Sequence, residues 1–281
     1  MEKAKLIFEN YNHIIEKGYD KILSGFKGDD ILKLGEEKIN SLLKGDIKEW
    51  EHTPIPSLDG LSPKEFFYSL NDLAHTMEIF RMGAEICDKD LPEVFLDRLE
   101  YFGESVVEEL LKLSVDTVLI NSSENYFIPI LSIRTLGRLK KESAIEPLLD
   151  MAYKLNEENE NLVEEINDAL VAIGKPVINH IIDRIMDQKR IGYIDEYVLN
   201  ALVRVGKDNK SDEIFRCLKE AFAKMDDRIL GALCLSDYGD GRAIPALRGF
   251  LEKNRASVDR QTYLEIAAAI KRLGGNIDDL I

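Results

Sequence analysis

The chain has 281 residues, of which 45% are hydrophobic and 32% are charged, and its formal net charge is −15 at pH 7. This composition excludes a disordered or fibrous protein, and the length predicts either two domains or one elongated repeat array. Because nucleic-acid affinity comes largely from cationic side chains that neutralise phosphates, the acidic charge disfavours a nucleic-acid-binding function.

The first ten residues, MEKAKLIFEN, carry Glu2 and Glu9 where a secretion signal needs a basic region and a long apolar stretch. Apolar runs stay far short of the roughly 18 residues that span a bilayer. The three cysteines, Cys87, Cys217 and Cys234, are widely spaced within apolar helical patterns, which is typical of buried free thiols. We therefore expect a cytoplasmic protein that does not contact the membrane.

Residues 1–90 predict a helical cap or small domain, with helical patterns at about 2–17, 30–44 and 63–81. The third helix has a clear start, because Ser62 can act as N-cap, Pro63 as first helical residue and Glu65 as capping-box partner.

A loop is predicted before that helix, because the segment 50–60 contains Pro54 and Pro56, which forbid a continuous helix. Trp50 at its start has two interpretations. It can anchor the loop onto its own helices, as buried tryptophans commonly do, or it can form part of a partner-binding loop.

From residue 91 to residue 281 the chain predicts a repeat array. Glycines that follow an apolar helical pattern recur with spacings of 34, 37, 32, 33 and 35 residues. These glycines are Gly103, Gly137, Gly174, Gly206, Gly239 and Gly274. Glycine just past a helix is the expected left-handed cap, so the spacing indicates one helical hairpin per repeat.

The helix before each glycine repeats the same apolar face. The residue immediately before the glycine is Phe102, Leu136, Ile173, Val205, Tyr238 or Leu273. The residue four before it is Leu99, Ile133, Leu170, Leu202, Leu235 or Ile270. The residue five before it is small at Ser132, Ala169, Ala201 and Ala269. A second amphipathic segment follows each glycine, so the repeat reads helix, short turn, helix.

The segments TLGRL…AIEPLL (135–149) and YGDGRAIPAL (238–247) resemble the short HEAT repeats of the phycobilin-lyase type. In that class the motif A-L-G-x-L-G-D leads into A-I-P-x-L, and the resemblance covers roughly residues 90–275. It implies an all-α fold, an α-solenoid of HEAT-like helical hairpins that here follows a divergent helical N-terminal region. It carries over no lyase catalytic residue, and a fold does not fix a function.

No motif for catalysis or cofactor binding appears in the sequence. The four histidines are scattered, no His-Glu dipeptide suggests a di-iron site, and neither a G-x-S-x-G elbow nor a phosphate-binding loop is present. The pair His75 and Glu78 has helical spacing but reads better as surface residues. We therefore predict no catalytic residue, no metal site and no cofactor.

Polar positions of the pre-glycine helices are the candidate partner-binding surface, since apolar positions are used in packing. They lie two, six and nine residues before the glycine. Tyr197, Asn200 and Arg204 are the best candidates, because tyrosine and arginine are favoured at interfaces. The equivalent polar residues of other repeats are Glu165, Asp168, Glu265 and Arg272. The alternative is a solvated helix face.

The acidic segment 154–168 predicts attraction of a basic partner, although such runs are commonly solvated turns and helix starts. The sequence as a whole favours a protein–protein interaction scaffold that binds another protein or peptide on the concave face of the solenoid. An enzyme or enzyme accessory of the lyase-like or chaperone-like HEAT class is the alternative, and nucleic-acid binding is a third and weaker one.

Overall fold

The computed structural model describes residues 1–25, 36–87, 90–121 and 126–280, and within these residues the regular structure is entirely helical. An isolated bridge between Ile191 and Met225 is the one strand-like pairing among them. The chain forms two compact units, Met1–Thr135 and Leu136–Ile281. The predicted all-α class is therefore confirmed.

The first unit is built from seven helices that lie wholly in its described residues, with a 3₁₀ turn between the second and third. These are α1 (Glu2–Gly25), α3 (Glu36–His52), η1 (Pro56–Leu58), α4 (Pro63–Tyr68), α5 (Leu73–Ile86), α6 (Glu93–Glu100), α7 (Glu104–Ser114) and α8 (Thr117–Ile120). α1 packs on α3 and α5, α4 packs on α6, and α5 packs on α7.

Aromatic side chains fill the core of the first unit. The ring centroids of Phe8 and Phe67 lie 5.8 Å apart, and those of Phe67 and Phe95 lie 4.9 Å apart. All three side chains are fully buried, and they come from α1, α4 and α6. Aromatic burial of this kind joins the segments before and after residue 90 into one core.

The helix start at residue 63 is confirmed. Ser62 accepts a hydrogen bond from the backbone N–H of Glu65, and the Glu65 carboxylate accepts one from the backbone N–H of Ser62 at 2.8 Å. The predicted helix 63–81 is interrupted, however, because α4 ends at Tyr68 and Asp72 caps the new helix α5 by accepting from the N–H of His75. Residues 30–35 of the predicted helix 30–44 lie outside the described residues.

The placement of Trp50 in a loop is wrong, because α3 continues to His52. A proline restricts its own position and the one before it, so Pro54 leaves the helix free to extend through residue 52. The indole is 5% exposed, and its Nε1 donates to Oδ1 of Asn10 at 2.7 Å. Trp50 therefore holds α3 against α1.

The second unit contains the last turn of α9 (Phe127–Leu139) and eight further α-helices among the described residues. These are α10 (Ile145–Ala152), α11 (Glu160–Ile173), α12 (Val177–Met186), α13 (Tyr193–Gly206), α14 (Asp212–Lys224), α15 (Arg228–Tyr238), α16 (Ile244–Asn254) and α17 (Arg260–Arg272). Short 3₁₀ turns η2 (Glu142–Ala144), η3 (Glu157–Asn159) and η4 (Gly241–Ala243) precede α10, α11 and α16.

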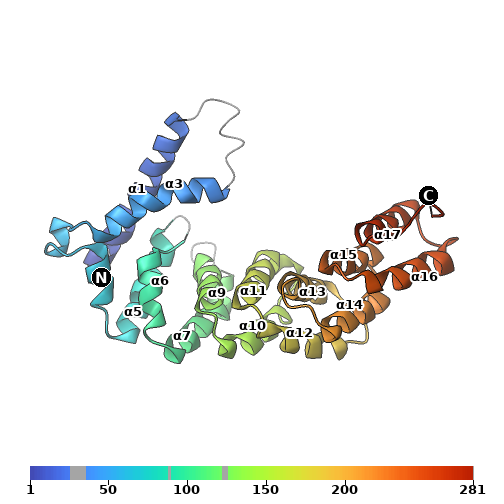
Figure 1. Cartoon of the computed structure of the whole chain (residues 1–281). Coiled ribbons are helices and arrows are strands. Elements are labelled where there is room, and N and C mark those ends of the chain that lie inside the picture. The colour runs from blue at the N-terminus through green and yellow to red at the C-terminus, as the bar shows by residue number, and fades with distance from the viewer. Residues whose placement is uncertain (26–35, 88–89, 122–125, 281) are drawn as a thin grey trace. The chain divides into compact units, whose positions relative to one another are not determined.

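These helices pack in two rows, which Figure 1 shows from α11 to α17. The helices that precede a glycine form one row, in which α11 contacts α13, α13 contacts α15, and α15 contacts α17. The helices that follow a glycine form the other, in which α10 contacts α12 and α12 contacts α14. Each helix of the second row also packs on the next helix of the first, as α12 does on α13.

The residue four before each glycine is the centre of the core. Leu99, Ile133, Leu170, Leu202, Leu235 and Ile270 are all 0% exposed. Five before the glycine, the two residues outside the small set are Cys234 and Arg98, and both are buried. Arg98 is the larger departure. Its Nε donates to the carbonyl oxygen of Leu70 at 2.7 Å, and its guanidinium lies 3.8 Å from the ring centroid of Tyr101.

The repeated glycines have two different roles. Gly103, Gly174, Gly239 and Gly274 have positive φ angles that L side chains rarely adopt, and Gly239 is the left-handed C-cap of α15. Gly137 and Gly206 are instead inside the last turn of α9 and α13. A Cβ at Gly137 would lie 2.7 Å from Cα of Ala169, and one at Gly206 would lie 3.2 Å from the Tyr238 ring.

The predicted domain boundary at residue 90 falls inside the first unit, where α4 packs on α6. The compact division comes after residue 135. The predicted boundary at residue 90 marks where the glycine repeat begins in the sequence. As a domain boundary it stays a prediction.

The three cysteines are free and buried, as predicted. Among the described residues, no helix combines the length and the apolar character needed to cross a membrane.

We predict opposite effects of alanine at two helical glycines. Gly137→Ala forces a methyl group against the backbone of Ala169 and should lower the free energy of unfolding by about 1–3 kcal/mol. Gly249→Ala, in α16, meets no atom within 4 Å and should raise it by about 0.5–1 kcal/mol through helix propensity. Urea denaturation followed by circular dichroism measures both, and a stabilised Gly137→Ala would contradict the close packing.

Candidate functional site

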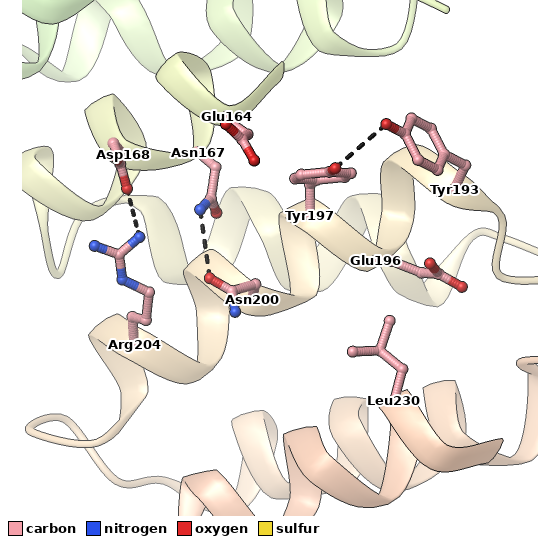
Figure 2. A pocket seen from close by; sticks show the side chains of 9 residues that line it. All are labelled: Glu164, Asn167, Asp168, Tyr193, Glu196, Tyr197, Asn200, Arg204 and Leu230. Atoms are coloured by element: carbon pink, nitrogen blue, oxygen red, sulfur yellow. Dashed lines mark hydrogen bonds and ion pairs between the residues drawn. The ribbon is translucent and has the colours of Figure 1, made fainter. Parts of the chain in front are cut away.

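Three consecutive helices of the pre-glycine row, α11, α13 and α15, surround an open pocket (Figure 2). The start of α13 is fixed by Asp195, whose carboxylate accepts from the N–H of Gly192 at 2.8 Å and from the Tyr153 hydroxyl at 2.6 Å. The start of α15 is fixed by Asp227, which accepts from the N–H groups of Ile229 and Leu230. These caps determine where the first-turn side chains of both helices lie.

The pocket has a volume of about 560 Å³. Its lining combines carboxylates, amides, two tyrosines, one arginine and one leucine. The lining residues are Glu164, Asn167, Asp168, Tyr193, Glu196, Tyr197, Asn200, Arg204 and Leu230.

Polar contacts join α11 to α13 along one side of the pocket, as Figure 2 shows for the two pairs Asp168 with Arg204 and Asn167 with Asn200. Arg204 Nη1 lies 2.5 Å from Oδ1 of Asp168, and Asn167 Nδ2 donates to Oδ1 of Asn200 at 3.3 Å. Both members of the ion pair are exposed, so the pair contributes at most about 1 kcal/mol to stability and mainly fixes the position of the arginine.

Tyr193 and Tyr197 form an edge-to-face pair one helical turn apart, with ring centroids 5.2 Å apart and an interplanar angle of 69°. The Tyr197 hydroxyl donates to Oε1 of Glu160 at 2.6 Å and lies 3.3 Å from the Tyr193 hydroxyl. The bond to Glu160, followed by that to Tyr193, raises the pKa of Tyr197 well above its ordinary value. The hydroxyl therefore stays a neutral donor and the ring is held in place.

Glu164 and Glu196 are the carboxylates of the pocket that have no cationic partner within ion-pair distance among the residues the structure describes. Glu196 is partly buried, and desolvation, followed by repulsion from Asp227 and Asp195, raises its pKa. Arg204, the one lining cation, is engaged with Asp168. The pocket therefore has an excess of negative charge.

A second open pocket, of about 660 Å³, shares Tyr193 with the first. Its lining includes Tyr153 and Glu158, which precede α13, and Asp195 in the first turn of that helix. Two open pockets therefore adjoin at Tyr193.

The structure brings together part of the predicted partner-binding surface. Tyr197, Asn200, Arg204 and Asp168 line one pocket. Glu165 is on α11 but does not line it, and Glu265 and Arg272 lie on α17, away from it.

The sequence reasoning missed Tyr193, Glu196, Leu230, Glu164 and Asn167. Tyr193 could have been found by continuing the Tyr197 stripe back one helical turn. Leu230 gave no signal, because an apolar residue in the first turn of a helix reads as core.

Two cysteines of the second unit are not nucleophiles in this fold. Burial raises the pKa of Cys217 and of Cys234 to about 12, so both thiols stay protonated at neutral pH. Among the described residues, no group of three or more His, Cys, Asp and Glu side chains is arranged to hold a metal ion.

We predict that Glu196→Gln stabilises the protein at pH 7. Because the raised pKa means that folding disfavours the ionised carboxylate, its cost is present at neutral pH and disappears as pH falls below the ordinary glutamate value of about 4.3. The gain in unfolding free energy should therefore shrink on acidification. Glu252→Gln, on the exposed surface of α16, removes the same charge as a control, and an equal gain in both variants would contradict the prediction.

The chain matches no protein-family model, no curated protein and no solved structure. Its function is therefore inferred from the pocket, the row of helices that forms it and the charges that line it.

Proposed function

We propose that this protein is an interaction scaffold that binds a polypeptide partner along α13, in the pocket between α11 and α15. The observation that carries the proposal is that four residues predicted to face a partner, Asp168, Tyr197, Asn200 and Arg204, lie together in one pocket. They come from two repeats, so the site depends on the stacking of repeats and not on a single helix.

The proposal includes a HEAT-like solenoid as the architecture, with this pocket on its concave face. It is supported by the two rows of helices, in which each helix contacts the next helix of its own row. It is further supported by the fully buried residue four before each glycine, because stacked repeats bury the same position in every unit.

A polypeptide suits this surface better than a compact ligand. The two pockets that share Tyr193 are both open, whereas sites for small molecules usually enclose most of the ligand surface. The exposed amide of Asn200 and the partly buried Tyr193 provide hydrogen-bonding groups beside an apolar wall at Leu230. Tyrosine and arginine are also the residue types that contribute most at protein interfaces.

We predict that Leu230→Arg abolishes partner binding, because it places a long charged side chain in the pocket. No side-chain hydrogen bond is lost, since leucine makes none. Leu264→Arg is the matched control, since Leu264 is a 44% exposed leucine on α17 outside the pocket. Affinity capture from the source organism, with mass spectrometry, should recover the same partners with the wild type and with Leu264→Arg.

A photo-crosslinking amino acid in place of Asn200 adds a positional test, because it should link only to a partner that occupies the pocket. Partners retained by Leu230→Arg, together with no crosslink at position 200, would show that the pocket is not the binding site.

A further inference from the structure

We propose that the pocket recognises a basic segment of its partner and seats one lysine or arginine side chain beside the Tyr193–Tyr197 pair, in a lining that also carries the carboxylates of Glu164 and Glu196. This inference rests on the proposed function, since it names the chemistry of the polypeptide that binds there. It is carried by the charge balance of the pocket, its aromatic wall and the environment of Glu196.

The charge of the lining is not balanced within the chain. Three carboxylates line the pocket, from Glu164, Asp168 and Glu196, against the one guanidinium of Arg204. Arg204 lies 2.5 Å from Asp168, so that pair is neutral and two carboxylates remain. A cationic group of a bound partner would neutralise these two carboxylates, which no cation among the described residues does.

The aromatic pair provides a second feature suited to a cation. Lysine and arginine head groups are attracted to the faces of tyrosine rings, most strongly where water is partly excluded. The Tyr197 ring is held by its bond to Glu160, and Figure 2 shows Glu164 and Glu196 on either side of it. Leu230 offers apolar surface on the α15 side, which suits the methylene stem of a long basic side chain.

The position of Glu196 gives a third argument. Glu196 is in the first turn of α13, where the helix dipole favours a negative charge and lowers a carboxyl pKa. Desolvation, followed by the repulsion of Asp227 and Asp195, acts in the opposite direction and raises the pKa. A guest cation would reverse the repulsion, so binding should release a proton near the raised pKa and should weaken as the pH falls through it.

The guest is a polypeptide side chain and not a free polyamine, because a second open pocket adjoins the first at Tyr193 and offers room for flanking residues. A flanking backbone can occupy that second pocket, and the carboxylate of Glu158 lies along it. A protonated polyamine has only donors, so it offers no acceptor for the amide N–H groups of Asn200, whereas a peptide carbonyl oxygen does.

The test uses fluorescein-labelled heptapeptide pools that are random except at the central residue, which is arginine, lysine, citrulline, acetyl-lysine or glutamate. Fluorescence anisotropy with the full-length protein should show binding of the arginine and lysine pools that is at least tenfold tighter than that of their neutral isosteres. The double variant Glu164→Gln with Glu196→Gln should lose at least tenfold in affinity for the basic pools.

The control for general attraction to an acidic protein is the double variant Glu220→Gln with Glu252→Gln, which removes the same charge outside the pocket and should bind like the wild type. Acidification should weaken binding of the basic pools more in the wild type than in Glu196→Gln. Spermidine should compete poorly. Equal losses in the two double variants, or a spermidine affinity equal to that of the peptides, overturn the inference.

The outcomes also separate this inference from the proposed function. If the citrulline and acetyl-lysine pools bind as tightly as the basic ones and Leu230→Arg abolishes both, the pocket binds polypeptide and the cation preference is wrong. If no pool binds and Leu230→Arg leaves the captured partners unchanged, the proposed binding site itself is wrong.

Discussion

The site depends on how closely successive helices of one row approach each other. Gly137 lets the last turn of α9 pack directly on the backbone of Ala169 in α11, and Gly206 lets the last turn of α13 meet Tyr238 and Ile214. Because small residues set this spacing, side chains one repeat apart come to lie opposite each other. Asp168 and Arg204 meet in this way, and so do Glu160 and Tyr197.

Polar side chains one repeat apart also meet in the other row of helices, between α10 and α12. His180 Nδ1 lies 2.6 Å from Glu146, and Arg184 bridges Glu146 and Asp150. The bond from His180 and the contacts with Arg184 lower the pKa of Glu146. Exposed pairs of this kind add little stability, so they mainly specify which residues face each other from repeat to repeat. In the pocket, by contrast, Glu164 and Glu196 form no such ion pair with a described residue of the neighbouring repeat.

Most of the fold and about half of the pocket could be predicted from the sequence, for identifiable reasons. Leu170, Leu202 and Leu235 follow a strict register, so their burial could be read from spacing alone. The sequence could not tell the two roles of the repeated glycines apart. Because glycine has no Cβ, it suits both a positive φ angle and a close contact between helices. Leu230 and Glu196 needed the packing of α15 against α13, which no local pattern encodes.

The environment of Glu196 is the point at which local preferences and the folded structure disagree. The first turn of a helix favours a carboxylate, yet desolvation, followed by repulsion from Asp227 and Asp195, raises the pKa of Glu196. A glutamine there would keep the size and hydrogen-bonding capacity of the side chain without the repulsion. Departures from local consistency that lower stability are characteristic of functional sites. Under the proposed function, a cationic side chain of the partner would offset the cost of this charge.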